Sequence, residues 1–220
     1  LEDTSAMFSL FLDALVLRLY EEEKLYEFSR HSKIPIINGL TNESHPCQVL
    51  TDIFTFQEIR GSISGKKVVW LGVANNVFQS FLHAAVALNF QIVFSGPMKF
   101  QPTKKMLDFL QSHDSHVLTV EQNPIVAVKK ADLVVTDKWA SMHDDQLGKP
   151  DLDELSKFKV TKQLLDYANQ EVLFMHCLPA NKGQEATQNI FEDKRCVSLQ
   201  EAENRMHLQK SILRWCIGLF

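Results

Sequence analysis

Short apolar runs of strand length alternate with longer amphipathic segments along most of the 220-residue chain. Helical patterns separate the apolar runs, because apolar side chains in the intervening segments recur at a spacing of three and four residues. This alternation is typical of an α/β fold in which helices cover parallel sheets. The runs that predict strands are residues 14–18, 34–37, 67–71, 91–94, 132–136 and 172–176.

Three segments carry clear helix patterns. The strongest covers residues 75–89, where Asn75 or Asn76 is able to cap the helix start. Residues 45–60 predict a second helix, with a proline in its first turn and a glycine directly after its end. Residues 201–218 predict a closing helix.

The connecting segments carry fewer signals. Residues 61–67, GSISGKK, form a turn rich in glycine and serine that we expect to be a domain hinge. They do not form a P-loop, because three residues rather than four separate the glycines and Lys67 stands where a magnesium-binding hydroxyl belongs. Residues 71–76, LGVANN, contain one glycine and so predict no nicotinamide cofactor. Residues 143–153 are expected to form a polar loop.

Composition excludes several classes of protein. The net charge is -4 and the basic residues are scattered, which does not predict a nucleic-acid partner. The four cysteines form no C-x-x-C pair, so free thiols in a reducing compartment are expected. No apolar run approaches the ~18 residues of a membrane span, and the acidic N-terminal segment is unlike a secretory signal. The chain begins at Leu1 inside a helical pattern, which suggests that further residues precede it.

Polar residues gather at the predicted carboxyl ends of strands, where open parallel sheets bind ligands. A basic side chain, a helix start, an acid and paired amides at one edge are suited to holding an anion beside an amine. Taken singly, Arg18 could be a surface residue, and Asp137 and Ser141 could cap a turn. The segments concerned are Arg18, HPCQ at 45–48, VANN at 73–76, DKWASM at 137–142 and HCLP at 176–179.

His176 and Cys177 stand side by side after an apolar run, either as the end of a buried strand or as a reactive centre. Adjacent strand residues point to opposite faces, so a papain-like pair of the two is a poor interpretation. His113 and His116 have a spacing that could hold a metal on a helix, but no third ligand is near them in the sequence. We expect these two histidines to be solvated, and no metal site is predicted.

Five motifs, taken together and in order, resemble the aspartate/ornithine carbamoyltransferase family over essentially the whole chain. HCLP is closer to the ornithine members than to the aspartate members. Two departures from the family pattern are Val73, in place of an acid, and His143, in place of a glycine. The family's S-x-R-T motif does not occur in these residues, so the resemblance implies an incomplete first domain. The motifs are PIINGL at 35–40, HPCQ at 45–48, DKWASM at 137–142, HCLP at 176–179 and EAENR at 201–205.

The resemblance implies a two-domain architecture. Residues 1–58 would form the C-terminal part of a domain that binds carbamoyl phosphate, and residues 59–200 a domain that binds ornithine. Residues 201–220 would pack back on the first domain. The resemblance also implies a homotrimer without a metal or organic cofactor, placed in the cytoplasm or, in an animal, in the mitochondrial matrix.

The site residues implied by the resemblance fall into two sets. Carbamoyl phosphate would be bound by Arg18, His45, Gln48, Cys177, Leu178 and Arg205. L-Ornithine would be bound by Asn76, Asp137, Ser141 and Met142. Catalytic roles are expected for Cys177, Asp137, His45 and Arg18, with Cys177 placing the δ-amine rather than forming a covalent intermediate.

The implied reaction transfers the carbamoyl group from carbamoyl phosphate to the δ-amine of L-ornithine, giving L-citrulline and phosphate, as in arginine biosynthesis. Because the S-x-R-T motif is missing, the 220 residues alone are expected to form little or no citrulline. Two alternatives stay open at this point. One is a carbamoyltransferase for another amine such as putrescine, and the other is a catalytically silent unit that binds ornithine or a partner subunit.

Overall fold

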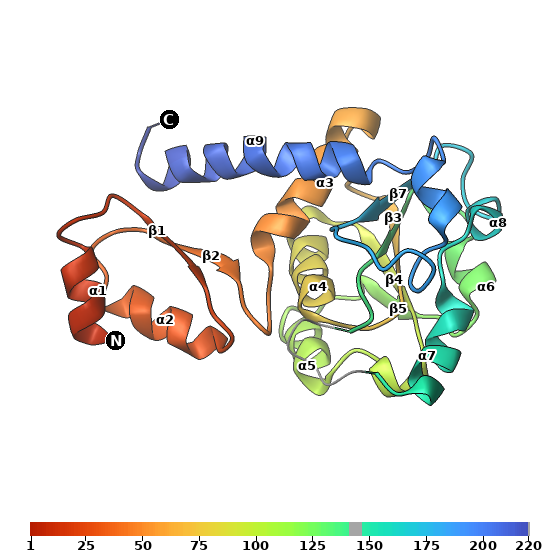
Figure 1. Cartoon of the computed structure of the whole chain (residues 1–220), viewed down its shortest axis with the longest axis horizontal. Coiled ribbons are helices and arrows are strands. Elements are labelled where there is room, and N and C mark those ends of the chain that lie inside the picture. The colour runs from red at the N-terminus through yellow and green to blue at the C-terminus, as the bar shows by residue number, and fades with distance from the viewer. Residues whose placement is uncertain (141–146, 220) are drawn as a thin grey trace.

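The computed structural model describes residues 1–140 and 147–219, and over these residues the chain forms two parallel sheets (Figure 1). Within the described residues, the smaller sheet pairs β1 with β2, and the larger holds five strands in the order β5-β4-β3-β6-β7. Parallel neighbours need a crossover connection, which helices mostly supply here. The strands are β1 Leu15–Arg18, β2 Ile36–Leu40, β3 Lys67–Leu71, β4 Gln91–Ser95, β5 Leu118–Val120, β6 Leu133–Thr136 and β7 Leu173–His176.

The strand predictions are confirmed, with small shifts at the ends. The largest shift is at 34–37, where the structure has β2 at Ile36–Leu40. Strand β5 was not predicted, because it is three residues long, lies at the sheet edge and is largely exposed. The fold class, α/β with parallel sheets covered by helices, is therefore confirmed.

Helices cover both faces of the larger sheet (Figure 1). The 3-10 helices are η1 Met98–Phe100, η2 Ser156–Phe158 and η3 Gln188–Glu192. The α-helices are α1 Glu2–Phe8, α2 Glu22–Arg30, α3 Pro46–Arg60, α4 Asn76–Leu88, α5 Lys104–Ser112, α6 Pro124–Val128, α7 Lys149–Leu155, α8 Lys162–Leu165 and α9 Ser198–Cys216.

The three predicted helices are confirmed as α3, α4 and α9. Asn75 is the cap of α4, since its Oδ1 accepts hydrogen bonds from the backbone N–H groups of Val77 and Phe78, both at 3.1 Å. The expectation of a polar loop over 143–153 is wrong from Lys149 onward, because α7 begins there with a proline and an acid in its first turn, both of which favour a helix start. Residues 143–146 lie outside the described residues.

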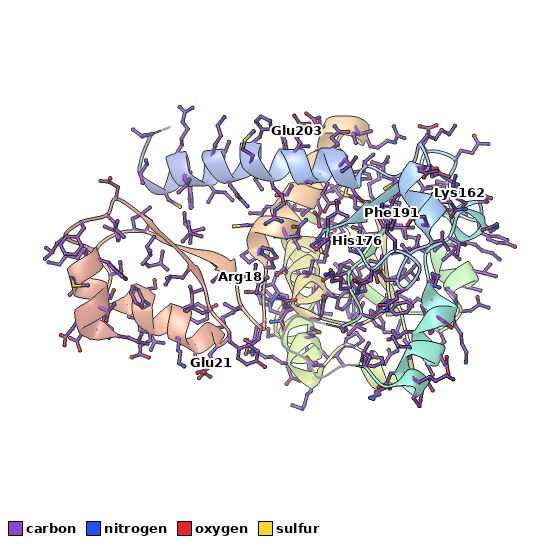
Figure 2. The ribbon with its side chains drawn as sticks, viewed as in Figure 1. Arg18, Glu21, Lys162, His176, Phe191 and Glu203 are labelled. Carbon is purple, nitrogen blue, oxygen red and sulfur yellow. The ribbon has the colours of Figure 1, made fainter. Side chains whose placement is uncertain are left out.

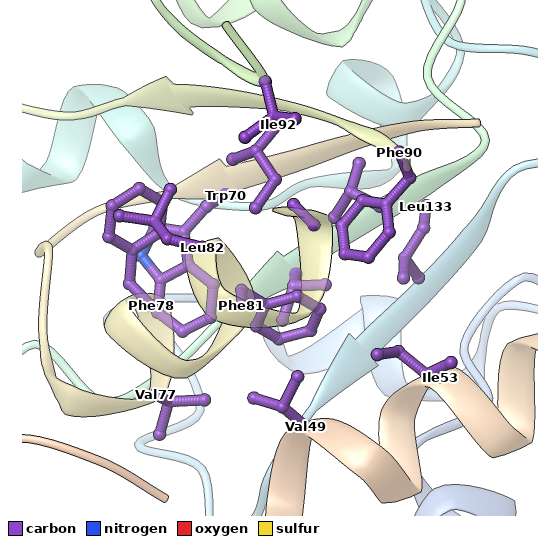
Figure 3. Close-up of a cluster of buried hydrophobic side chains, with 14 of the residues drawn as sticks. Val49, Ile53, Trp70, Val77, Phe78, Phe81, Leu82, Phe90, Ile92 and Leu133 are labelled. Atoms are coloured by element: carbon purple, nitrogen blue, oxygen red, sulfur yellow. The ribbon is translucent and has the colours of Figure 1, made fainter. Parts of the chain in front are cut away.

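The main core lies between the larger sheet and helices α3 and α4 (Figure 3). Trp70 of β3 is 1% exposed and packs against Phe78 and Phe81 of α4, with ring centroids 5.6 and 5.8 Å away. The next residues toward each end of β3, Val69 and Leu71, face a second buried cluster on the other side of the sheet. Side chains of a strand alternate between faces, so β3 is buried on both and forms the centre of the fold.

Helix α9 starts beside β7 and runs across α3 toward the smaller sheet (Figure 1). Near its start, Asn204 Nδ2 donates to Thr55 Oγ1 at 3.0 Å and to Glu58 Oε2 at 3.1 Å on α3. Farther along, Leu213 lines a small cavity together with Val16 of β1. The C-terminal helix therefore joins the larger sheet, α3 and the smaller sheet.

Candidate active site

Three strands of the larger sheet end at the same level. The last residues of β3, β6 and β7 are neighbours in register, Leu71 with Thr136 and Thr136 with His176. The residues that follow β6 and β7 are thereby brought together, and Cys177 Sγ donates a hydrogen bond to Asp137 Oδ1 at 2.8 Å. The convergence predicted for these two residues is confirmed.

The carboxylate of Asp137 is held on both oxygens. Besides the thiol, the backbone N–H of Lys138 donates to Oδ1 at 2.7 Å, and Asn75 Nδ2 donates to Oδ2 at 2.7 Å. Asn76, which is expected to bind ornithine, directly follows Asn75, and its Nδ2 donates to the Thr41 carbonyl at 2.7 Å. Asn75 was not among the expected site residues, although its position as a helix cap beside a strand end is a signal for it.

Cys177 is a neutral thiol in this environment. Burial raises its pKa well above the ordinary value, and the negative charge and the hydrogen-bonded carboxylate of Asp137 raise it further. A thiolate is the nucleophilic form of cysteine, and this site disfavours it. Cys177 is accordingly suited to donating a hydrogen bond rather than to attacking a substrate.

His176 is fully buried, as is its partner Glu185. Its Nδ1 accepts a hydrogen bond from the Leu178 N–H at 3.0 Å, so its Nε2 carries the proton and donates to Glu185 Oε1 at 3.1 Å. The expectation of a hydrogen-bonded histidine that ends a buried strand is confirmed. These bonds hold the turn after β7, in which Leu178 has a φ of 39° and the Leu178-Pro179 peptide bond is cis.

One group of metal-ligand type occurs among the described residues, formed by Asp137, His176 and Cys177, whose ligand atoms lie within 4.8 Å of one another. Both nitrogens of His176 already have hydrogen-bond partners, so an ion would have to break one of these bonds. The residues thus fit hydrogen bonding better than metal binding. His113 packs against Phe109 with ring centroids 4.4 Å apart and ring planes tilted by 43°, and it joins no ligand group among the described residues.

Positively charged side chains and a buried imidazole lie beside the start of α3. His45 is buried, and its backbone N–H donates to Ser80 Oγ at 2.8 Å, while its Nδ1 has no hydrogen-bond partner in the part of the chain that the structure describes. Burial, and then the charges of Arg205 and Arg18, lower the pKa of His45 to about 4. His45 is therefore neutral at neutral pH. Arg18 is exposed, on the side of β1 that faces α3 (Figure 2).

Gln48 lies one turn after His45 and is fully buried. Its Nε2 donates to Asp52 Oδ1 and to Glu201 Oε1, both at 2.7 Å. Burial raises the pKa of Asp52 to about 7 and that of Glu201 well above its ordinary value. Neither acid was singled out in the sequence, because their proximity arises only when α9 packs on α3.

A pocket of about 420 Å³ opens beside Cys177 and Leu178, with Arg205 of α9 on its wall. The pocket brings together three of the residues expected to bind carbamoyl phosphate. Ser141 and Met142, expected to bind ornithine, lie outside the described residues, as does His143. The remaining lining residues are Ala202, Met206, Gln209, Lys210 and Leu213.

Two family models match the chain. The model described as the carbamoyl-P binding domain of aspartate/ornithine carbamoyltransferase matches residues 1–58. The model described as the Asp/Orn binding domain of the same family matches residues 64–216. The resemblance seen in the motifs is confirmed.

Individual relatives agree with the family models. An ornithine carbamoyltransferase of Ruegeria pomeroyi is 44% identical over 217 residues, which cover 98% of this chain and 70% of that protein. The solved ornithine carbamoyltransferase of Burkholderia thailandensis has a TM-score of 0.89 at 37% identity, covering 98% of this chain and 69% of that one. The Pyrococcus furiosus enzyme has a TM-score of 0.91 at 34% identity, covering 99% and 70%.

No helix of the described residues combines the length and the apolar character that crossing a membrane requires.

Proposed function

Because the chain belongs to the aspartate/ornithine carbamoyltransferase family, we propose that it acts as an ornithine carbamoyltransferase. It transfers the carbamoyl group of carbamoyl phosphate to the δ-amine of L-ornithine, giving L-citrulline and phosphate. The observation that carries the proposal is the hydrogen bond from Cys177 to Asp137 beside a pocket whose wall also holds Arg205. An acid for the amine and a guanidinium for the phosphate thus lie at one site.

Carbamoyl phosphate is held by side chains of β1, α3 and α9. Arg18 and Arg205 bind its oxygens, since a guanidinium offers a fork of N–H donors to phosphate. His45 is neutral at neutral pH and donates a hydrogen bond to the carbonyl oxygen without carrying a charge. Gln48 and the Leu178 carbonyl orient the NH2 group.

Ornithine is held at the carboxyl ends of β3 and β6. Asp137 and Asn76 contact its amino acid end, together with Ser141 and Met142, and Cys177 places its δ-amine. The support in the described residues is that Asp137 is fixed by three donors before any substrate arrives. A preorganised acceptor lowers the entropic cost of orienting the amine.

The chemical step needs the neutral form of the δ-amine. This amine attacks the carbamoyl carbon, and the tetrahedral intermediate collapses to citrulline and phosphate. Arginine side chains stabilise the charge that develops on the carbonyl and leaving oxygens. The neutral thiol of Cys177 supports a mechanism without an acyl-enzyme, and the rate should rise with pH as ornithine loses a proton.

Further properties expected from the resemblance belong to this proposal. They are a homotrimer, a cytoplasmic location, a role in arginine biosynthesis, and a division into residues 1–58, 59–200 and 201–220. The ends of the two matched family models, at residue 58 and residue 64, lie close to the proposed first boundary.

Substrate choice provides the test. Calorimetry on the 220-residue chain, with phosphonoacetamide present in place of carbamoyl phosphate, should show tighter binding of L-ornithine than of putrescine, because putrescine keeps both amines but lacks the α-carboxylate. Asp137→Asn should weaken ornithine binding, whereas Asp151→Asn, which removes a surface carboxylate paired with Lys99, should leave it unchanged. Equal or tighter binding of putrescine would refute the choice of ornithine. The same samples test the prediction of little citrulline formation by these 220 residues alone.

A further inference from the structure

Three polar side chains are sealed between α3 and α9 next to the site. Gln48 is 0% exposed, and Asp52 and Glu201 are each 1% exposed. Burying two acids side by side is costly unless hydrogen bonds and a shared proton compensate. The substrate roles proposed above involve Gln48 but leave both acids without a purpose.

The hydrogen bonds of Gln48 determine which way its amide points. Its nitrogen has two N–H groups, and both are used, by Asp52 Oδ1 and Glu201 Oε1 at 2.7 Å. The amide oxygen is consequently turned away from the two acids. This Oε1 is buried and has no hydrogen-bond partner among residues 1–140 and 147–219, which leaves a strong acceptor available for a ligand.

The two acids lie close enough to share one proton. Glu201 accepts from Gln48 on Oε1 and from the His176 backbone N–H on Oε2, at 3.2 Å. Asp52 Oδ2 receives no N–H donor from the described residues, and the two carboxyl groups lie within hydrogen-bonding reach of one another. A proton shared between the two carboxyl groups gives Asp52 Oδ2 a partner.

The surrounding charges are consistent with one proton on the pair. Arg205 is the cation near Asp52, and the thiols of Cys177 and Cys196 and the carboxylate of Asp137 are the other titratable groups that face the two acids. One negative charge shared by the pair balances Arg205. A second would stand unpaired in a buried space.

We propose that Asp52 and Glu201 are positioning residues, which hold the Gln48 amide so that its oxygen accepts a hydrogen bond from the NH2 group of carbamoyl phosphate. The inference rests on the proposed function. Gln48 lies one turn after His45 on α3, and Glu201 lies one turn before Arg205 on α9, so each belongs to the helix face that carries a proposed ligand of the same substrate.

If the Gln48 oxygen accepts from the NH2 group, the chain should bind an amide analogue of carbamoyl phosphate more tightly than the matching ketone. Phosphonoacetamide carries the NH2 group, whereas acetonylphosphonate has the same shape and charge with a methyl group in its place. A hydrogen bond of this kind contributes about 0.5 to 1.5 kcal/mol, so the wild-type chain should bind the amide about 2- to 10-fold more tightly. Binding of the ketone should not depend on how Gln48 is oriented.

Isosteric variants test the assignment. Glu201→Gln cannot accept hydrogen bonds from both Gln48 and the His176 N–H, so the Gln48 amide loses its fixed orientation. Asp52→Asn keeps an oxygen that accepts from Gln48 and offers an N–H group to Glu201, so it should preserve the arrangement. Glu58→Gln is the matched control, because Glu58 also joins α3 to α9, through Gln200 and Asn204, without touching Gln48.

Two measurements on the 220-residue chain follow these variants. NMR reports hydrogen exchange of the Gln48 side-chain NH2 without any ligand, and calorimetry reports the ratio of the two dissociation constants. Wild type, Asp52→Asn and Glu58→Gln should show slow exchange and selectivity for the amide. Glu201→Gln should exchange at least about 10-fold faster and show a weaker preference for the amide, because only the Leu178 carbonyl then accepts from the NH2 group; its ketone affinity should be unchanged.

Several results would overturn the inference. They are unchanged exchange and selectivity in Glu201→Gln, an equal loss in Glu58→Gln, or an equal loss in Asp52→Asn. If Glu201→Gln does not fold, Asp52→Leu removes the other acceptor of the same amide and must show the same loss. If wild type binds neither phosphonate, the proposed binding of carbamoyl phosphate by these 220 residues is refuted, and the exchange rates alone decide whether Glu201 holds Gln48.

Discussion

Replacing Asp137 with asparagine should make Cys177 more reactive. The Asp137 carboxylate lies 2.8 Å from the thiol and raises its pKa through its charge and its hydrogen bond. A charge at this range generally shifts a pKa by about 1 to 3 units, and removal of this like charge should lower the pKa of Cys177. Burial, the largest cause of the raised pKa, remains in the variant, so the pKa should stay above its ordinary value.

The assay is alkylation of Cys177 by iodoacetamide at pH 8, followed by mass spectrometry of the peptide that contains it. Only the thiolate reacts, and its fraction grows about tenfold for each unit by which the pKa falls. The Asp137→Asn variant should therefore react about 10- to 100-fold faster than wild type. The partly buried Cys216 gives an internal reference for reagent and folding.

A matched control separates charge from general loosening of the structure. Asp151→Asn also removes a carboxylate, but one that pairs with Lys99 on the surface, so Cys177 should react as in wild type. Equal or slower alkylation in a folded Asp137→Asn variant would show that the carboxylate does not suppress the thiolate. The assignment of Cys177 as a neutral donor would then be wrong.

Three further predictions concern the imidazole and the core. The ring protons of His45 should titrate in NMR with a midpoint near pH 4. Because the unfolded chain binds this proton at higher pH, the free energy of unfolding should decrease as the pH is lowered from about 6.5 to 4. An equally steep decrease in His45→Gln would contradict this. Trp70→Ala should lower the free energy of unfolding by about 3 to 5 kcal/mol in urea titrations, since the indole is fully buried, and a cost below about 1 kcal/mol would refute the packing. Gly96→Ala should lower the melting temperature measured by circular dichroism, because a Cβ there would lie 1.9 Å from the Gly72 carbonyl oxygen. Gly148→Ala should not, because within the described part of the chain its Cβ would meet nothing closer than 3.6 Å.

Much of the larger sheet was predictable because its central strands are buried on both faces. The apolar runs at 67–71 and 132–136 predict such strands from local sequence alone, without information about tertiary contacts. The edge strand at Leu118–Val120 lacks this signal, because it is short and mostly exposed. The helix at Lys149–Leu155 was missed because its polar residues also suit a loop, and its apolar contact is mainly Leu155.

At the site, local signals identified residues that follow strands but could not resolve neighbours. Asp137 and Cys177 were found because each comes directly after a buried strand. Asn75 and Asn76 look alike in the sequence, and only the geometry of the helix start shows which one reaches Asp137. The contact of Gln48 with its partner on α9 spans 153 residues, and no local pattern encodes it.

Asn75 limits which substitutions this site can accept. Its Oδ1 caps the N-terminus of helix α4, and its Nδ2 donates a hydrogen bond to Asp137. One side chain therefore serves both the helix and the site. Aspartate would keep the cap but repel the carboxylate, and serine would keep the cap but offer a shorter side chain. In a saturation library selected separately for solubility and for activity, position 75 should accept several capping residues in the first selection and asparagine alone in the second.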